Sequence, residues 1–265
     1  MTVAIVIPAR YASTRYPGKP LAQLRGADGV AKSLIERSWR AAMKVSGVDR
    51  VVVATDDDRI RVAAEGFGAE VVMTSSECRN GTERCADALP QLEGVEVVVN
   101  LQGDAPLTPA WFVEELVTAL KVRTDVACAT PVLRTEGRAL NGFLEDRKAG
   151  RVGGTTAVFG RDGQALYFSK EVIPYLGRSY ADDAETPVFH HVGVYAYRPD
   201  ALRRYVEHPI GPLEQLEGLE QLRFLENGEK VLCVEVEARG RQFWELNNPE
   251  DVPRLEAMMA EMGLS

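Results

Sequence analysis

Residues 3–21 read Val3-Ala-Ile-Val-Ile-Pro-Ala-Arg-Tyr-Ala-Ser-Thr-Arg-Tyr-Pro-Gly-Lys-Pro-Leu21. The first five are apolar and largely β-branched, which predicts a buried strand that ends at Pro8. The loop that follows combines cations with small and turn-forming residues, namely Arg10, Ser13, Thr14, Arg15, Pro17, Gly18 and Lys19. Since an α/β sheet binds ligands beyond the carboxyl ends of its strands, three cations at this position predict a polyphosphate site.

Two common phosphate-binding motifs do not match this loop. A dinucleotide fingerprint needs three glycines at fixed spacing, whereas the loop contains only Gly18. A Walker loop needs Ser or Thr after Gly-Lys, but Pro20 follows Lys19. The loop therefore represents a third kind, built on side-chain cations; the alternative is an ordinary solvated basic loop.

Composition limits the classes of function. The chain has 265 residues, 45% of them hydrophobic, enough for one large domain or two modest ones. A net charge of −8 argues against a nucleic acid or an anionic membrane as partner. The four cysteines form no Cys-x-x-Cys pair and are expected to be reduced thiols. With no apolar run of membrane-spanning length and no basic-then-apolar N-terminus, we expect a soluble cytoplasmic protein.

Alternating strands and helices predict an α/β fold with a mostly parallel, three-layered sheet over residues 3–130. The strands expected there are 3–7, 50–55, 70–73, 96–101 and 125–130, and the helices are 31–45, 59–67, 81–89 and 111–122. After residue 131 the strands 152–159, 165–168 and 189–197 are joined by turns, and helices are expected at 200–207 and 213–226. A strand at 230–237 and a helix at 249–262 close the chain. We therefore predict a core of residues 1–130 and 229–265, with an inserted subdomain of residues 131–228 and a loop or lid at 177–186.

Asp104 is the strongest candidate for a metal-binding carboxylate. It follows a predicted central strand and Gly103, although a turn-forming role for an Asp at this position is the alternative. Nucleotidyl transfer requires a metal-bound triphosphate and cations on the departing pyrophosphate, and Lys19 is expected on the α or β phosphate. Gln102 offers a donor and an acceptor to a substrate. The run of residues 56–58, three aspartates, more plausibly caps a helix than binds a metal.

Residues 7–15 and 17–21 resemble the opening signature of the 3-deoxy-manno-octulosonate (KDO) cytidylyltransferases. Four further segments are similar to motifs of that family, namely residues 81–84, 100–104, 191–198 and 212–223. The resemblance implies a Rossmann-like nucleotidyltransferase fold with an inserted α+β subdomain for acceptor binding and dimerisation. It also implies a Mg²⁺-dependent, cytoplasmic homodimer that joins CTP and KDO into CMP-KDO for lipopolysaccharide biosynthesis.

The resemblance assigns expected roles to individual residues. Catalytic residues would be Arg10, Arg15, Lys19 and Asp104. Nucleotide contacts would come from Pro8, Ala9, Arg10, Ser13, Lys19, Thr74, Arg84 and Gln102. The acceptor would be bound by Gln102, His191, Tyr195 and Gln221. Without the resemblance, His191 could equally be an ordinary strand histidine.

Two departures from the family pattern affect these assignments. Asn247 stands where the family has a metal-binding aspartate, and Glu245, two residues earlier on a predicted strand face, could supply the missing charge. The expected metal ligands are therefore Asp104, Asn247 and Glu245. Residues 151–159, with Gly153, Gly154 and Thr155, replace larger polar groups near the expected acceptor. The acceptor site is expected to be altered.

Three hypotheses follow. The chain is a cytidylyltransferase for KDO itself, or it uses the same CTP chemistry on another acidic acceptor, such as a modified sugar acid or a phosphonate. The third is a non-catalytic nucleotide-binding protein, for which Asn247 is the one supporting residue.

Overall fold

The structure, a computed structural model, describes residues 1–13, 15–152, 154–241 and 244–265. Thr14 and Gly153, named above, lie outside the described residues. The chain divides into two compact units, residues 1–114, 197–202 and 238–265, and residues 115–196 and 203–237. These bounds differ from the division expected near residues 130 and 229, and the roles expected for the two parts remain predictions. We describe each unit separately.

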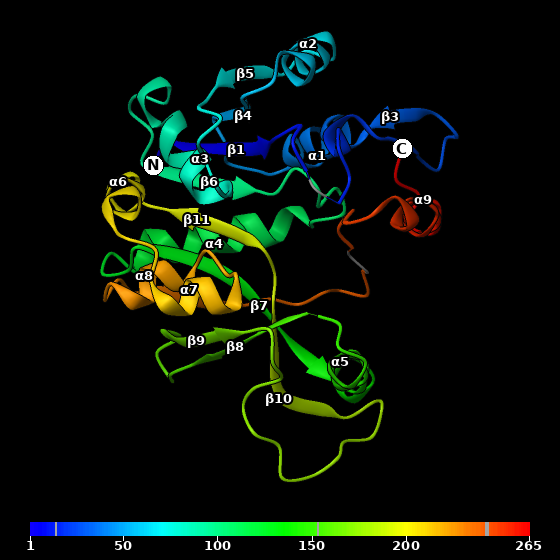
Figure 1. Ribbon diagram of the computed structural model, residues 1–265, viewed down its shortest axis with the longest axis vertical. Helices are drawn as coiled ribbons and strands as arrows, with labels where there is room; N and C mark the ends of the chain where they lie inside the picture. The colour runs from blue at the N-terminus through cyan, green and yellow to red at the C-terminus, as the bar shows by residue number, and fades with distance from the viewer. Residues whose placement is uncertain (14, 153, 242–243) are drawn as a thin grey trace. The chain divides into compact units, whose positions relative to one another are not determined.

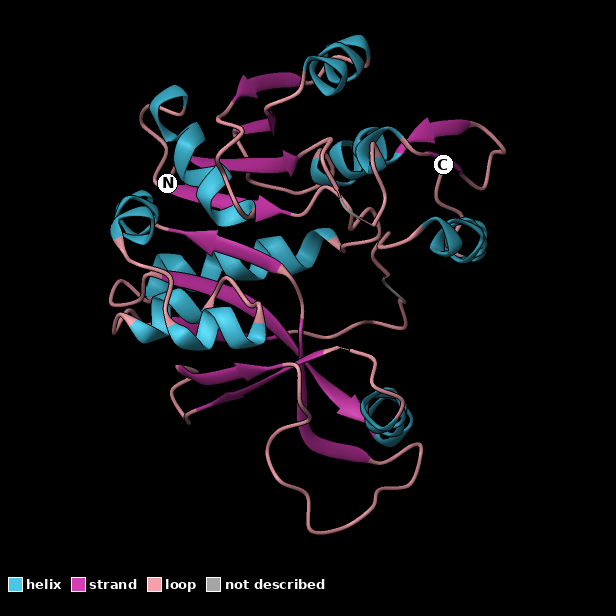
Figure 2. Ribbon diagram, viewed as in Figure 1, coloured by secondary structure: helices cyan, strands magenta, loops and turns pink. Residues whose placement is uncertain are grey.

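The first unit is built on parallel strands in the order β5–β4–β1–β6 (Figures 1 and 2). Their bounds are Val3–Ala9 for β1, Arg50–Thr55 for β4, Glu70–Met73 for β5 and Val97–Leu101 for β6. The prediction that Pro8 ends the first strand is wrong, because Pro8 pairs in register with Ala54 and β1 continues to Ala9. Residues 3–7 and 97–101 are at most 1% exposed, so β1 and β6 form the centre of the core.

Helices follow these strands where the alternation of strands and helices predicts them, but some of their ends differ from the predicted ones. Helix α1 is Leu34–Ala42, shorter than expected, because residues 31–33 form β3 and Ser33 caps the helix by accepting from the backbone N–H of Glu36. Helix α2 is Asp58–Gly66 with Asp57 as its N-cap, as predicted. The first unit also contains β2 (Gln23–Arg25), α3 (Gly81–Ala88), α9 (Val252–Glu261) and short 3₁₀ turns at Lys19–Leu21, Leu89–Gln91 and Pro249–Asp251. Helices α4 (Ala110–Val122) and α6 (Pro199–Glu207) are each divided between the two units.

Helix α9, the last helix of the first unit, packs against β2 of the β2–β3 hairpin. Leu24 and Leu34 form one buried cluster with residues far along the chain, namely Leu107, Leu246, Leu255, Met258 and Met259. The backbone N–H of Arg25 also donates to the carboxylate of Glu256 in α9. This packing fixes residues 244–247, which come just before α9, against the first unit.

The second unit surrounds β7 (Cys128–Glu136). Strand β12 (Val231–Glu235) pairs with it in parallel and β10 (Glu185–His191) antiparallel, while β8 (Thr155–Phe159) joins β10 to β9 (Ala165–Ser169). The strand predicted at 189–197 is two strands, β10 and β11 (Val194–Tyr197). The helix predicted at 213–226 is α7 (Pro212–Glu217) and α8 (Leu222–Glu226), separated at Gly218, whose φ is +62°.

Helix α5 (Gly137–Lys148) was not predicted, and it fixes part of the expected lid. The backbone N–H groups of Gly137 and Arg138 donate to the carbonyls of Ala184 and Asp182 (both 2.9 Å). Asn141 adds a side-chain bond to Asp182. The loop 177–184 is thus tied to α5, and whether it closes over a ligand remains a prediction.

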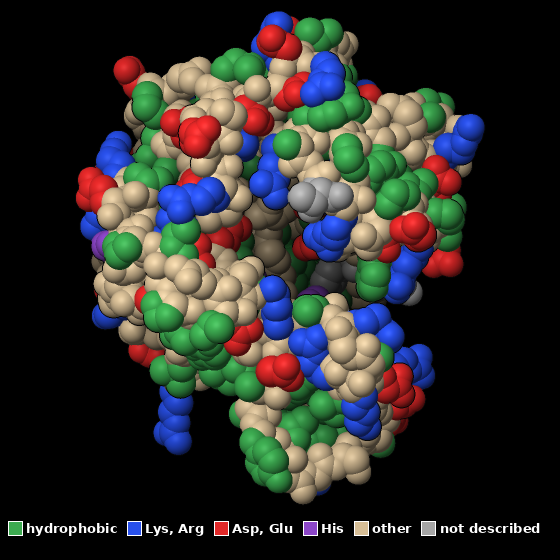
Figure 3. All heavy atoms as spheres, viewed as in Figure 1, with side chains coloured by type: hydrophobic (Ala, Val, Ile, Leu, Met, Phe, Trp, Pro, Cys, Tyr) green, Lys and Arg blue, Asp and Glu red, His purple; other side chains and the backbone are tan. Residues whose placement is uncertain are grey.

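No helix in the described part of the chain is long and apolar enough to cross a membrane. On the face drawn in Figure 3, acidic and basic side chains are intermixed. On this face the basic side chains of the described residues form no continuous patch.

Candidate active site

The carboxyl ends of β1 and β6 form a point where the strand order reverses. From β1 the chain builds β4 and β5 on one side, and then places β6 on the other side of β1. In open α/β sheets such a switch point is where ligands bind. A cavity of about 240 Å³ lies there. It is lined by Pro8, Ala9, Arg10, Ser13, Arg15, Lys19, Pro20, Leu34, Cys78, Arg79, Asn80, Gly81, Arg84, Gln102, Gly103 and Asp104.

Gly103 allows the two strand ends to approach each other. A Cβ at this position would lie 2.7 Å from the carbonyl oxygen of Pro8, closer than side chains tolerate. Ser38 of α1 donates its hydroxyl to the carbonyl of Gly103 (2.9 Å) and so fixes the turn. This turn brings Gln102 and Asp104 to the end of β1.

The cation loop, residues 10–19, faces Asp104 through its last residue. Gly18 has a φ of +72°, and its N–H donates to the carbonyl of Tyr11 (3.0 Å), which closes the loop. Lys19 then places its Nζ 2.5 Å from Oδ2 of Asp104. The expected phosphate cation and the expected metal carboxylate therefore form an ion pair in this structure.

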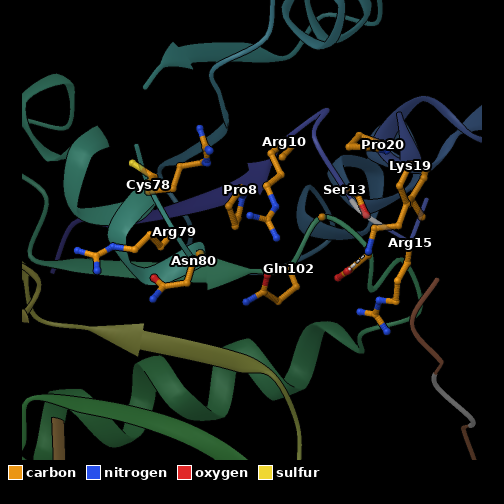
Figure 4. Close-up of a pocket in the computed structure, with 16 residues that line it drawn as sticks. Pro8, Arg10, Ser13, Arg15, Lys19, Pro20, Cys78, Arg79, Asn80 and Gln102 are labelled. Carbon is orange, nitrogen blue, oxygen red and sulfur yellow. Dashed lines mark hydrogen bonds and ion pairs between the residues drawn. The ribbon is translucent and has the colours of Figure 1, made fainter. Parts of the chain in front are cut away.

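Arg10 and Gln102 lie centrally in the cavity, with Lys19 and Arg15 on one side of them (Figure 4). Arg10 is exposed and makes no ion pair within the described residues. Arg15 donates through Nη2 to Oδ1 of Asn247 (3.3 Å). Two of the three predicted cations thus contact predicted metal-site residues, and the third faces the cavity.

Sequence analysis missed the residues that line the other side of the cavity, Cys78, Arg79 and Asn80 (Figure 4). Asn80 is the N-cap of α3, and its side chain accepts from the N–H of Glu83. A polar pair before a predicted helix at the same sheet edge was the signal that could have revealed these residues.

Arg84 lines the cavity, as predicted, but its side chain is already paired. It is 3% exposed, donates to Oγ1 of Thr74 (2.6 Å) and lies 3.2 Å from Oδ1 of Asp56. Thr74 contacts the site through Arg84 and is not among the cavity-lining residues. The neighbouring aspartates also have separate partners, since Asp57 caps α2 and Asp58 pairs with Arg61.

Residues 244–247 are irregular, so the prediction that Glu245 and Asn247 share a strand face is wrong. Their position comes instead from backbone bonds. Leu246 donates its N–H to the carbonyl of Asp104 (2.9 Å), and Asn247 donates its N–H to the carboxylate of Asp251 (3.0 Å). These bonds hold Glu245 and Asn247 beside Asp104.

The charges in this corner suit a hard cation. Desolvation, followed by the negative charge of Asp104, raises the pKa of Glu245 to about 7. The Glu245 side chain is exposed to solvent, so water weakens both the desolvation and the repulsion and reduces the size of the pKa shift without changing its direction. Two carboxylates and the amide oxygen of Asn247 are the oxygen ligands that Mg²⁺ prefers. Among the described residues no group of three His, Cys, Asp or Glu side chains could hold a metal.

The three residues expected on the acceptor side lie together in the second unit. Tyr195 donates its hydroxyl to Oε1 of Gln221 (3.1 Å), and the rings of Tyr195 and His191 are 5.6 Å apart. His191 Nε2 bonds to Oγ1 of Thr130 (2.9 Å). All three are at most 6% exposed, and Nε2 of Gln221 has no hydrogen-bond partner among the described residues.

Gly154 is one of the small residues in segment 151–159, which differs from the family pattern, and it is closely packed. A Cβ there would lie 2.8 Å from the ring of Phe143 and 3.2 Å from the ring of His190. Phe143 belongs to α5, and its ring lies 5.2 Å from that of His190. The space that a larger side chain would need at this position is therefore occupied by Phe143.

Known proteins match this chain along most of its length. Residues 4–231 match the family described as cytidylyltransferase. The 3-deoxy-manno-octulosonate cytidylyltransferase of Maricaulis maris is 44% identical over 99% of both chains. That of Chlamydia pneumoniae is 40% identical over 95% of this chain and 91% of the relative, and a mitochondrial enzyme of the same name from Arabidopsis thaliana is 40% identical over 98% and 84%.

Two solved structures also match this chain. A CMP:2-keto-3-deoxy-manno-octonic acid synthetase complexed with CTP matches with a TM-score of 0.83 and 33% identity, over 99% of this chain and all of the other. A cytidylyltransferase from Leptospira borgpetersenii, 17% identical over 97% of this chain and 86% of the other, shares the fold with a TM-score of 0.60.

Proposed function

The chain belongs to the cytidylyltransferase family, and from this membership we propose that it transfers CMP from CTP to KDO, forming CMP-KDO and releasing pyrophosphate. In this reaction an acceptor hydroxyl attacks the α-phosphorus and the bond to pyrophosphate breaks. The observation that carries the proposal is the cavity at the switch point, where a cation loop faces the Gln102-Gly103-Asp104 turn.

The cation loop supplies positive charge where the triphosphate is expected. Arg10 faces the cavity without an ion-pair partner in the described residues, and so is available to a phosphate. Lys19 is held by Asp104, and Arg15 by Asn247. Phosphates entering the cavity would compete for both side chains, and charge-assisted bonds to them favour the departing pyrophosphate.

Asp104, Glu245 and Asn247 are the residues we assign to Mg²⁺. The repulsion between the two carboxylates indicates that a cation would stabilise this corner. When bound, Mg²⁺ supplies positive charge and orientation to the triphosphate. Asp104 would then exchange Lys19 for the ion, which would leave Lys19 available to the phosphates.

KDO is the acceptor that the full-length relatives support. We assign its binding to His191, Tyr195 and Gln221 of the second unit. The free donor of Gln221 is buried, and a buried donor without a partner is costly unless a ligand satisfies it. The packing of Phe143 against Gly154 explains the small residue at position 154, so this departure does not by itself require another acceptor.

We further propose that the enzyme is a cytoplasmic homodimer assembled through residues 131–228. Several large apolar side chains in this segment are exposed, including Leu166 (68%), Tyr175 (93%) and Leu216 (83%). Contiguous exposed apolar surface marks protein–protein interfaces, and these side chains are the candidates for such a surface.

Pyrophosphate release tests the function directly. Each of CTP, UTP, ATP and GTP is combined with KDO, a second keto-acid sugar and a phosphonate, with and without Mg²⁺. We expect release with CTP and KDO in Mg²⁺ to exceed every other combination by at least tenfold. Equal rates with UTP, or a faster rate with another acceptor, would refute the assigned substrates. No release in any combination would favour a non-catalytic protein.

A further inference from the structure

Tyr11, the second residue of the cation loop, lies against an arginine from a different element. The guanidinium carbon of Arg59 in α2 is 3.3 Å from the centroid of the Tyr11 ring. Arginine over an aromatic face at this distance is a cation–π contact. Neither residue lines the cavity, so the contact lies outside the site described above.

The guanidinium of Arg59 is fixed before it meets the ring. Asp57 accepts from Nε (2.9 Å) and from Nη2 (2.6 Å) of Arg59, and this two-bond pairing sets the plane of the group. Asp57 is also the N-cap of α2 and accepts from the N–H of Arg59. The position of the cation is therefore set by the start of α2.

Tyr11 in turn is joined to the far end of the loop. Its carbonyl accepts from the N–H of Gly18 (3.0 Å), and a Cβ at Gly18 would lie 3.0–3.1 Å from atoms of the Tyr11 ring. Tyr11 and Gly18 are the chain neighbours of Arg10 and Lys19. A contact that holds Tyr11 thus holds both ends of the loop that carry the cavity cations.

We propose that Arg59 and Tyr11 are positioning residues that hold the cation loop in its nucleotide-binding conformation before CTP arrives. The inference rests on the proposed function for its ligand, but the contact itself does not depend on it. Binding is stronger when the binding groups are already ordered, since ordering them on association reduces affinity. Arg59 acts through Tyr11, because Asp57 holds its Nε and Nη2 and Arg59 does not line the cavity.

The first test measures the dissociation constant of CTP by calorimetry without acceptor. Arg59→Ala should weaken binding about two- to fivefold, the equivalent of one exposed cation–π contact. Arg59→Lys should recover part of the loss. Arg61→Ala is the matched control, because it removes the same charge from the same helix, where Arg61 pairs with Asp58 and Glu65. Equal weakening by both alanine variants would overturn the proposal, since charge alone would then explain it.

A double-mutant cycle tests whether Arg59 acts through Tyr11. Tyr11→Phe keeps the ring and should bind CTP as the parent does, whereas Tyr11→Leu should weaken binding as Arg59→Ala does. The Arg59→Ala change should then have no further effect in the Tyr11→Leu protein. Additive losses would contradict coupling and would indicate that Arg59 binds the nucleotide itself.

A second readout needs no nucleotide. Trypsin cleavage after Arg15 in the ligand-free protein, followed by mass spectrometry, reports how often the loop opens. We expect faster cleavage in Arg59→Ala than in Arg61→Ala and the parent, with unchanged global unfolding in denaturant. Equal cleavage rates would overturn the proposal. If the parent does not bind CTP, the proposed function fails, and this readout still decides whether the contact holds the loop.

Discussion

Lys19 and Asp104 each have a second expected role besides their ion pair. Lys19 is the predicted phosphate cation, and Asp104 the predicted metal ligand. Their contact at 2.5 Å neutralises both while they are only partly buried, with side chains 16% and 25% exposed. Separating the pair would leave neither charge unpaired, because a phosphate would replace Asp104 beside Lys19 and the metal would replace Lys19 beside Asp104.

Replacing Asp104 with Asn should therefore abolish turnover without unfolding the protein. We expect kcat to fall by about 10²–10³, because the metal carboxylate is lost. Lys19→Ala should lower kcat more than it raises KM for the acceptor. Steady-state pyrophosphate release, with a thermal melt to confirm folding, measures both. An Asp104→Asn enzyme within tenfold of the parent would show that another residue holds the metal.

The metal corner is tested through Glu245 and Asn247. Glu245→Gln should raise the Mg²⁺ concentration needed for half-maximal pyrophosphate release, because a hard cation loses an anionic oxygen. Asn247→Asp should lower that concentration or leave it unchanged. If Glu245→Gln responds to Mg²⁺ as the parent does, Glu245 takes no part in binding the ion and Asp104 acts with Asn247 alone.

His190 and His191 should make the protein less stable in mild acid. Burial lowers the pKa of His191 to about 3 and that of His190 to about 4, from an ordinary 6.5. With the native pKa depressed, the unfolded state binds more protons, so stability is complete above pH 6.5 and falls as pH drops toward 3–4. Each histidine contributes a slope of up to about 1.4 kcal/mol per pH unit.

His191→Gln should therefore reduce the pH dependence of unfolding. Urea unfolding of the parent and the variant at pH 7, 6 and 5 gives the two slopes. A shallower slope in the variant is the expected result. An unchanged slope would mean that His191 is accessible to protons in the folded protein.

At this scale the sequence predicted which residues form the site better than it predicted how they are paired. Arg10, Lys19, Gln102 and Asp104 all line one cavity, as expected from their places after buried strands. The bond from Arg84 to Asp56 was not foreseeable, since it joins side chains whose approach depends on the packing of α3 against β4.

The turn after β6 is the element on which the geometry of the cavity depends. Gly103→Ala would place a Cβ 2.7 Å from the carbonyl of Pro8, so the ends of β1 and β6 would have to separate. We expect a loss of about 1–3 kcal/mol in stability, typical of overpacking, together with weaker CTP binding.

Gly66→Ala is the matched control for this change. Gly66 lies in α2, where a Cβ would meet no atom within 4 Å, and alanine favours helix over glycine. Denaturant unfolding and CTP calorimetry should show a neutral or stabilised control. If both variants unfold alike, close approach at Gly103 does not matter.

Element boundaries were predicted well where apolar runs are flanked by polar residues, as for β4 and β5, whose bounds agree with expectation. Helix α5 was missed although Leu140, Phe143 and Leu144 repeat at helical spacing, because two glycines in the segment favour a loop. The break between α7 and α8 follows from the positive φ of Gly218, a conformation that periodicity does not reveal.

For the whole molecule we predict a homodimer at micromolar concentration. Leu216→Glu, in the exposed apolar set of residues 131–228, should shift sedimentation toward monomer because a charge then faces the interface. Val122→Glu is the control, since Val122 is 76% exposed but lies outside that segment. A parent protein that sediments as an active monomer would contradict the assembly.

The fold class was predictable because strand and helix periods alternate over the first 130 residues and the carboxyl-end loops carry charge. The bounds of the two units were less predictable, since the first unit ends at Glu114, within α4, and β7 lies wholly in the second unit. The acceptor was even less predictable, because the packing of Gly154 against Phe143 depends on helix α5, which was not predicted.

The most direct test of the central claim is a competition analysed by mass spectrometry. The protein, CTP and Mg²⁺ are incubated with equal amounts of KDO, another keto-acid sugar and a phosphonate, and the cytidylylated products are identified. CMP-KDO as the dominant product, formed with one pyrophosphate per molecule, is the predicted result. A dominant CMP conjugate of another acceptor, or no conjugate at all, would contradict the assignment.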